Sequence, residues 1–150
     1  MSRDDPATEN TAGVANAAAE VRTGVMRLAR RLRSERDPGE LTLGRMAVLG
    51  RLERDGPATT SGLAVAERVT PQSMARMVQH LISAGLAERA PDPDDRRAAI
   101  IRITDTGRER VQQDRDRREA WLAQAMTELS DVEQDLLVLA ARLLDRLADS

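Results

Sequence analysis

The chain has no cysteine, phenylalanine or tyrosine, and Trp121 and His80 are the single members of their residue types. Without cysteine there is no disulfide framework, no thiolate metal site and no thiol redox switch. One histidine, with no glycine-rich phosphate loop and no serine in a nucleophile elbow, leaves little from which to build an active site. We therefore expect no enzymatic activity, no cofactor and no bound metal.

Long apolar runs are also missing. No segment approaches the roughly 18 consecutive apolar residues of a membrane span. The opening MSRDDPATEN lacks both the basic and the apolar region of a secretory signal. At 150 residues, 41% hydrophobic and 32% charged, the chain has the composition of one globular domain with a substantial core. We expect a cytoplasmic protein with no membrane partner.

The most informative segment that is present lies between residues 61 and 104. Thr70 is a good helix N-cap, and Pro71 follows at the first helical position, where its missing N–H costs nothing. The sequence predicts a helix over residues 70–84, closed by Gly85. Its core-facing residues recur at helical spacing and are Met74, Met77, Val78, Leu81 and Ile82. The opposite face suits DNA base edges and carries Gln72, Ser73, Arg76, Gln79, His80 and Ser83.

A second short helix and a hairpin complete the segment. Residues 61–69 predict a helix capped by Ser61, with Leu63, Ala64 and Val69 turned inward. Residues 86–90 and 98–103 predict two strands, which the charged loop 91–97 joins. Two short helices followed by a hairpin are the plan of a winged helix-turn-helix. The predicted fold class is therefore mainly α with a small β part (α+β).

The run SGLAVAERVTPQSMARMVQHLISAGLAERAPDPDDRRAAIIRITDTG resembles the multiple-antibiotic-resistance regulator (MarR) family of bacterial transcription factors. The resemblance extends over roughly residues 14 to 148 when the flanking helices are included. It rests on the order and spacing of Leu63-Ala64, Val69-Thr70-Pro71, Leu81, Gly85-Leu86, Arg89, Asp95-Arg96-Arg97, Ile103-Thr104 and Gly107. It implies a sequence-specific DNA-binding regulator, a dimeric repressor that reads a palindromic operator.

In this interpretation helix 70–84 enters the major groove, where glutamine can pair with adenine and arginine with guanine. The residues expected to contact DNA from the two helices are Ser61, Thr70, Gln72, Ser73, Arg76 and His80. The resemblance implies that the wing 91–97 enters the minor groove through Arg96 or Arg97. It also implies that Asp95 braces the wing by pairing with an arginine.

The segments that flank the winged helix predict long helices. Residues 14–32 keep one apolar stripe, and a capping-box signature at Ser130 and Glu133 precedes a wide apolar face. This is more apolar surface than a small winged helix can cover. We therefore predict a disordered tail (1–12) and one domain (13–150), with dimerisation helices (13–36 and 105–150) around a DNA-binding lobe (42–104). The alternative is that these helices pack on each other within a monomer.

The net charge of the chain is not the positive one expected of a DNA-binding protein. The net charge is −2, and residues 60–104 hold 6 arginines and 5 acidic residues, so attraction must come from where the arginines point. The alternatives are a winged-helix protein-interaction module and a sequence-tolerant DNA-coating protein. The resemblance also implies a small-molecule effector in the cleft between the dimer helices and the winged helix. The residues leave the existence and identity of that effector open.

Overall fold

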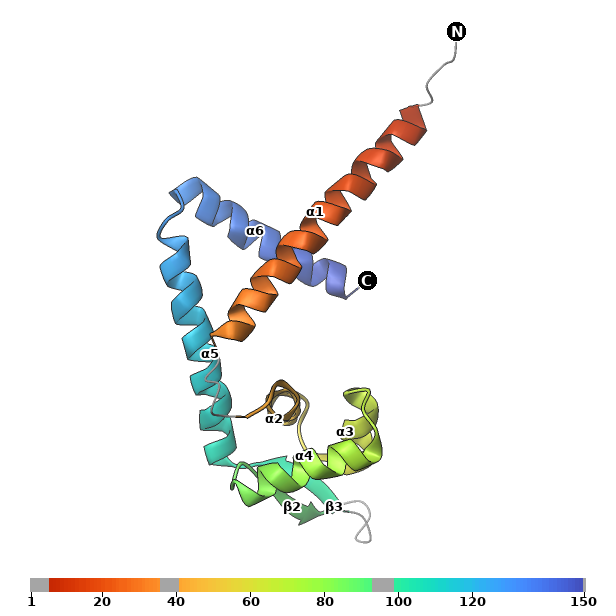
Figure 1. The fold of residues 1–150 in the computed structure, drawn as a ribbon, viewed down its shortest axis with the longest axis vertical. Helices are drawn as coiled ribbons and strands as arrows, with labels where there is room; N and C mark the ends of the chain where they lie inside the picture. Colours follow the sequence, from red (N-terminus) through yellow and green to blue (C-terminus); the bar gives the residue numbers. More distant parts are fainter. Residues whose placement is uncertain (1–5, 36–40, 93–98, 150) are drawn as a thin grey trace. The chain divides into compact units, whose positions relative to one another are not determined.

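The computed structural model describes residues 6–35, 41–92 and 99–149. Figure 1 shows a mainly helical chain with one small antiparallel sheet, in which the strands lie in the order β1-β3-β2. The predicted fold class is confirmed. The elements are α1 (Pro6–Ser34), α2 (Leu43–Asp55), β1 (Ala58–Thr59), α3 (Thr60–Ala66), α4 (Pro71–Ser83), β2 (Ala87–Pro91), β3 (Ala99–Ile103), α5 (Asp105–Met126) and α6 (Asp131–Ala148).

The chain divides into two compact units, and α5 contributes to both. We call residues 37–117 the winged unit, and residues 1–36 together with 118–150 the helical unit. None of the described helices is long and apolar enough to cross a membrane.

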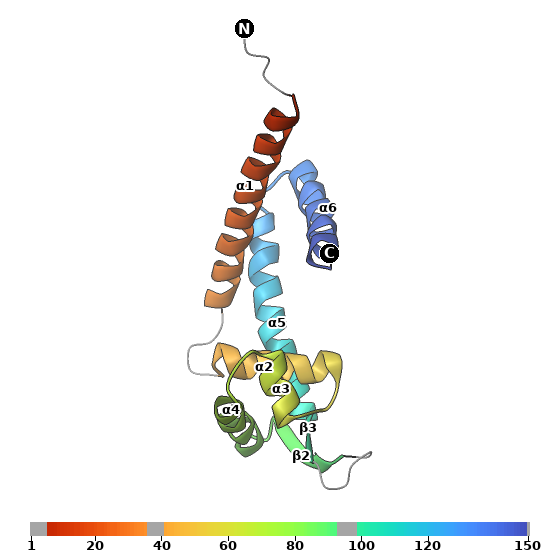
Figure 2. The same ribbon diagram turned by 90° about the vertical axis from the view of Figure 1, so that its right-hand side faces the viewer.

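The core of the winged unit lies where α2, α3 and α4 meet the sheet (Figures 1 and 2). Each fully buried aliphatic side chain contributes about 1.5–3 kcal/mol relative to an exposed one. The largest fully buried side chains are Val48, Leu49, Leu52, Leu63, Met74, Val78, Leu81 and Ile101. They come from three helices and the central strand, so this core fixes how α3 and α4 are held.

The sequence predicts a helix that starts at the cap Thr42, ends at the Gly56-Pro57 break and forms the floor of the winged helix, and α2 matches it. Its N-cap is Thr42, whose side chain accepts a hydrogen bond from the Arg45 N–H at 3.5 Å. Met46, Leu49 and Leu52 are buried, whereas Leu43 in the first turn is 53% exposed. Val48 is fully buried instead, because α2 packs against both α4 and β3 and therefore buries a wider face than one stripe.

The predicted hairpin is confirmed as β2 and β3, which pair antiparallel from Ala87 opposite Ile103 to Pro91 opposite Ala99. The hairpin projects beyond the three helices in Figure 2. A third strand, β1, pairs Ala58 with Ile101. The sequence did not predict β1, because two residues are too few to show the alternation that marks a strand.

The junction between β3 and α5 is held by Thr104. Its hydroxyl oxygen accepts from the Gly107 N–H at 3.1 Å and so caps the start of α5, and its hydroxyl donates to the Gly85 carbonyl at 2.7 Å. The Thr104 N–H donates to the Leu86 carbonyl at 3.1 Å. A Cβ on Gly107 would lie 2.1 Å from that same carbonyl oxygen. Only glycine therefore fits at this position.

In the helical unit, α1 begins at Pro6, ahead of residue 13, where the sequence interpretation started the helix. Proline is well accommodated in a first helical turn, because its nitrogen needs no partner there. The polar character of residues 6–12, which suggested a tail, does not by itself prevent a helix. Residues 6–12 are thus helical in this structure.

The turn from α5 into α6 is closed by the predicted capping box. The Ser130 N–H donates to the Glu133 carboxylate at 2.9 Å, and the Glu133 N–H donates to the Ser130 hydroxyl at 3.4 Å. The hydrogen bonds from Ser130 hold the pKa of the Glu133 carboxyl below its usual value. The amide of Gln134 donates to the carbonyls of Met126 and Leu129, both at 3.1 Å, so these two backbone oxygens at and just after the end of α5 have hydrogen-bond partners.

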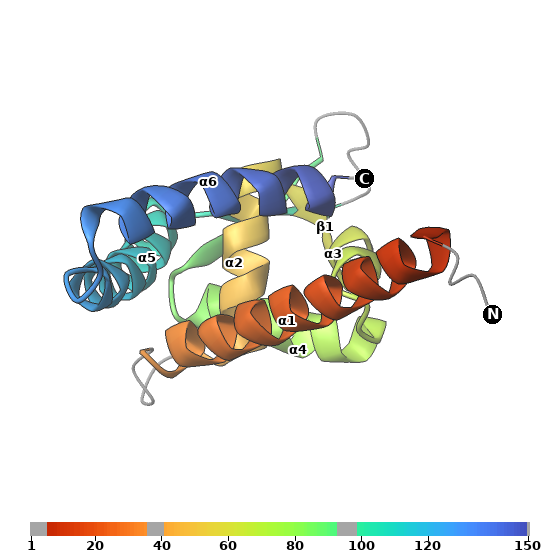
Figure 3. The ribbon, with the colours of Figure 1, turned by 90° about the horizontal axis from the view of Figure 1, so that it is seen from above.

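The helices of the helical unit leave their apolar faces uncovered. The ribbons of α1 and α6 cross in Figure 1 but lie apart in Figures 2 and 3. The one ring contact between helices of this unit among the described residues places the Arg31 guanidinium 4.7 Å from the centre of the Trp121 ring. No described residue of α6 is buried, and Leu136 is 59% exposed. The described parts of these helices therefore do not bury their apolar faces on each other in this structure.

Candidate nucleic-acid interface

The helix α4 begins and ends as its sequence predicts. Thr70 is the N-cap and accepts from the Ser73 N–H at 3.2 Å, and Pro71 occupies the first turn. At the other end, Gly85 has a φ of +71°, and its N–H donates to the Ile82 carbonyl at 2.9 Å. The Leu86 N–H donates to the Leu81 carbonyl at 2.9 Å. These two bonds form a Schellman motif, which needs a left-handed residue at the glycine.

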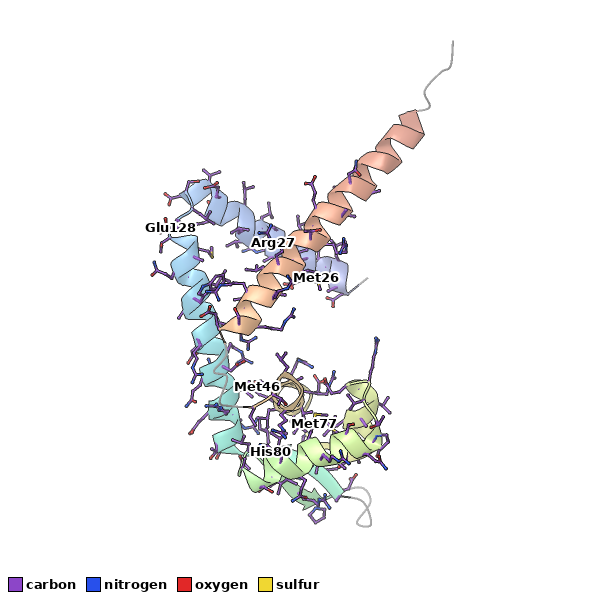
Figure 4. All side chains as sticks on the ribbon, viewed as in Figure 1. Met26, Arg27, Met46, Met77, His80 and Glu128 are labelled. Atoms are coloured by element: carbon purple, nitrogen blue, oxygen red, sulfur yellow. The ribbon has the colours of Figure 1, made fainter. Side chains whose placement is uncertain are left out.

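The two faces of α4 are also as predicted. Met74, Val78 and Leu81 are buried, whereas Met77 and Ile82 are half-buried against the same core. Figure 4 labels Met77 beneath α2 and His80 further along the same helix. The polar face is exposed along its whole length and consists of Gln72, Ser73, Arg76, Gln79, His80 and Ser83. Its placement is confirmed, and its contacts with DNA remain a prediction.

Two hydroxyl groups meet at the start of this face. Thr70 Oγ1 accepts from the Ser73 N–H and donates its own hydrogen to Ser73 Oγ at 2.9 Å. Thr70 therefore uses its hydroxyl hydrogen inside the protein. Ser73 accepts that hydrogen, so its own hydroxyl hydrogen can point outward beside Gln72 and Arg76. Of the two hydroxyls, Ser73 is the better donor to an external phosphate or base.

The predicted cap of α3 was wrong. The N-cap is Thr59, whose side chain accepts from the Gly62 N–H at 3.0 Å, and α3 covers Thr60–Ala66. Thr59 pairs with Ile100 in β1, which holds it in the extended conformation that an N-cap needs. Ser61 lies inside the first turn, is exposed, and has its hydroxyl 3.4 Å from that of Thr59. Three consecutive hydroxyl residues gave the sequence no means of choosing among them.

Replacing the cap tests this assignment. Thr59→Ala is expected to lower the free energy of unfolding by about 1 kcal/mol, because the Gly62 N–H loses its partner. Ser61→Ala is the matched control and is expected to change stability by less than about 0.5 kcal/mol. Urea titrations of both variants measure the difference. Equal losses would mean that Ser61 caps the helix after all.

An ion pair between α2 and α3 sets the local charge. Arg51 Nε donates to the Glu67 carboxylate at 2.5 Å, and Arg51 also reaches Asp55 at 2.9 Å. The hydrogen bond to Glu67 raises the pKa of the Arg51 guanidinium. Glu67 is the one acidic residue between residues 60 and 83. The sequence interpretation missed this pair, because two residues 16 positions apart carry no local signal of contact.

Two exposed arginines, Arg68 and Arg76, lie in the segment formed by α3, the turn and α4. Among the described residues, no ion pair joins Arg68 or Arg76 to an acid. Glu67, which precedes Arg68 in the chain, is paired with Arg51. Residues 60–83 thus hold two arginines and one acid, and that acid is paired with Arg51, so this stretch carries a net positive charge although the whole chain is slightly acidic.

The structure does not test the predicted contacts of the wing. Asp95, Arg96 and Arg97 lie outside the described residues, and β2 and β3 mark where the loop that holds them starts and ends. Among the residues that are described, no group of three or more histidine, cysteine, aspartate or glutamate side chains could hold a metal ion.

Comparison with known proteins gives a consistent result. The sequence model of the MarR family matches residues 41–99. The HTH-type transcriptional regulator MT0903.1 of Mycobacterium tuberculosis is 36% identical over 135 residues, which cover 90% of this chain and 94% of that protein.

Solved structures agree with the sequence comparison. A transcriptional regulator from Pseudomonas aeruginosa PA01 superimposes with a TM-score of 0.80 at 35% identity, over 92% of this chain and 97% of that one. A MarR family protein from Bacillus stearothermophilus shares the fold, with a TM-score of 0.74 at 20% identity over 93% of this chain and 98% of that one.

Proposed function

The chain belongs to the MarR family of transcriptional regulators, and on that premise we propose that it is a homodimeric repressor of a palindromic operator. In each protomer α4 reads the major groove and the wing enters the minor groove. The proposed DNA-binding lobe is 42–104, and the proposed dimerisation helices are 13–36 and 105–150. The observation that carries this proposal is the exposed polar face of α4 on an otherwise well-packed winged unit.

The chemistry of that face supports base recognition. Gln72 and Arg76 stand four residues apart on adjacent turns, so both can reach base edges from one side of the helix. Glutamine suits adenine and arginine suits guanine, and each good pair is worth about 1–3 kcal/mol of discrimination. Ser61, Thr70, Ser73 and His80 are proposed to contact the phosphates or bases beside them. In the wing we propose Arg96 or Arg97 for the minor groove, with Asp95 as the brace.

The uncovered helices support the dimer. Apolar residues on α1 and α6 would remain in water in a single chain, and a monomeric protein rarely exposes a continuous patch of this kind. The exposed apolar residues of α1, and of α6 on the side of Leu136 and Leu143, are Val14, Val21, Val25, Met26, Leu28, Val132, Leu136, Leu137, Leu139, Leu143, Leu144 and Leu147. A two-fold dimer would present two copies of α4 to major grooves roughly 34 Å apart, and a palindromic operator follows.

A protein-interaction module and a sequence-tolerant DNA-coating protein are the alternatives. The positive surface around Arg68 and Arg76 favours DNA over an average protein partner. Titration of a selected duplex and a shuffled one at several salt concentrations separates the three. A specific regulator prefers the selected duplex, a coating protein binds both with the same salt dependence, and an interaction module binds neither.

A small-molecule effector that releases the DNA is part of the proposal. Such a molecule acts only by binding one dimer conformation better than the other, because equal affinity for both shifts nothing. Sequencing the genomic fragments that the protein retains would give the operator. The neighbouring genes would then indicate which compounds to test and whether transcription falls, as a repressor requires.

The role of Arg76 can be tested directly. Arg76→Ala is expected to reduce operator affinity by about 1–3 kcal/mol and to relax the preference at one base pair, because a bidentate contact to a base is lost. Arg97→Ala should instead weaken all sequences more evenly. Both are measured by titration against the operator and its single-base variants. Wild-type affinity in both variants would remove the assignment.

A further inference from the structure

The turn between α3 and α4 holds a residue in an unusual backbone conformation. Arg68 has a φ of +53° and is the one residue other than glycine with a positive φ in the described part of the chain. Its N–H donates to the Val65 carbonyl at 3.1 Å, and the Val69 N–H donates to the Ala64 carbonyl at 3.0 Å. These bonds form a Schellman motif, the same motif that Gly85 completes at the end of α4.

The left-handed conformation costs free energy for any residue with a Cβ, and glycine avoids that cost. Glycine would therefore be favoured at this position of the turn, but the residue there is arginine. A residue that is kept in a strained conformation at an exposed turn points to a function of its side chain.

The Arg68 side chain has no partner among the described residues that would explain its position. The side chain is exposed, and no described residue forms an ion pair or a hydrogen bond with it. The adjacent acid, Glu67, is already paired with Arg51 at 2.5 Å. The guanidinium is thus a charge next to a neutralised acid, and it adds to the positive surface of α3 and α4. A purely structural role would require a partner inside the protein.

The position of Arg68 relative to α4 suggests what the partner is. Arg68 stands two residues before the N-cap Thr70, at the end of the helix that a helix-turn-helix directs toward the bases. The major groove is about 12 Å wide, so a residue just outside this end lies near the phosphates at its rim. The planar guanidinium matches phosphate oxygens through two parallel hydrogen bonds.

We propose that Arg68 binds a phosphate of the operator backbone and that the strained turn is retained for this contact. The inference rests on the proposed DNA-binding function, which it extends with a positioning contact outside α4 and the wing. A phosphate contact by Arg68 predicts a result that a purely structural role of this residue does not. Substitutions that relieve the turn stabilise the protein and weaken its binding to DNA.

The test uses the whole chain with three substitutions of Arg68 and one control substitution. Arg68→Gly and Arg68→Asn both suit a left-handed residue and remove the charge. Arg68→Lys keeps the charge. Arg54→Gln, which removes one charge from α2 in the same unit, is the matched control. The probes are a duplex that the wild-type protein selects from a randomised pool and a shuffled duplex of equal length, each titrated at several salt concentrations, with thermal unfolding measured in parallel.

Arg68→Gly and Arg68→Asn are expected to melt no lower than wild type and to lose about three- to tenfold in affinity for both duplexes. Their slope of log affinity against log salt should fall by about one contact per protomer, which is two per bound dimer. Arg68→Lys should keep most of the affinity, and Arg54→Gln should resemble wild type. Unchanged affinity and slope, or an affinity loss that comes with a lower melting temperature, would overturn the inference. Failure of the wild type to select any duplex would instead overturn the proposed function.

Discussion

Replacing Gly107 by alanine is expected to destabilise the protein by about 3 kcal/mol or more, a large effect for the addition of one methyl group. The new Cβ would lie 2.1 Å from the Leu86 carbonyl oxygen and 2.7 Å from Ile103 Cγ1. The Leu86 backbone cannot move away, because its N–H donates to Leu81 and its carbonyl accepts from Thr104. Thermal unfolding followed by circular dichroism should show a melting temperature lower by on the order of 10 °C.

The same substitution at Gly50 is the matched control. Gly50 lies within α2 of the same unit, and a Cβ there would meet nothing within 4 Å. Gly50→Ala is expected to raise stability by about 0.5–1 kcal/mol, because alanine loses less conformational freedom in a helix. Opposite signs for one chemical change would show that the close approach at Gly107 matters. A Gly107→Ala protein as stable as wild type would mean that the junction can open.

Two glutamates on the apolar face of α6 are expected to abolish the dimer and with it most of the operator affinity. Leu136 and Leu143 stand two helical turns apart on that face and are 59% and 42% exposed. In the double variant Leu136→Glu/Leu143→Glu, four carboxylates would have to be buried in a two-fold interface without partners. Affinity for the operator should fall by on the order of 10²- to 10⁴-fold, because the two half-sites are no longer bound by one linked molecule.

The control for this experiment lies on the other side of the same helix. Val138 is apolar and 48% exposed, but the 3.6-residue period places it opposite Leu136 and Leu143. Val138→Glu should therefore remain dimeric and bind the operator like wild type. Sedimentation velocity at micromolar concentration measures the oligomeric state of all three proteins. A monomeric wild type, or a double variant that remains dimeric, contradicts the proposed interface.

The helix α4 was predictable because each of its features is local. Thr70 and Pro71 mark its start, Gly85 marks its end, and the spacing of Met74, Val78 and Leu81 separates its faces. None of these signals depends on residues far away in the chain. The capping box of α6 was predictable for the same reason, since its two members are three residues apart.

The features that the sequence did not reveal depend on distant partners. Thr59 became the cap of α3 because β3 holds it extended, and this pairing joins residues about 40 positions apart. Arg51 neutralises Glu67 across two helices. The first half of α5 is almost wholly polar in sequence, yet Val111 is buried in the core of the winged unit. In each case the sequence shows the residue but does not show which distant residue it contacts.

The sequence by itself determined most of the helices, the hairpin of β2 and β3, and which face of α4 is polar, because caps, turn residues and helical periodicity act over a few residues. Tertiary structure alone decided that Gly107 must be glycine, that Arg68 is strained and that Glu67 is neutralised. These properties arise where segments distant in sequence meet in space. Such contacts are fixed by the packing of the whole unit, which no local pattern of residues records.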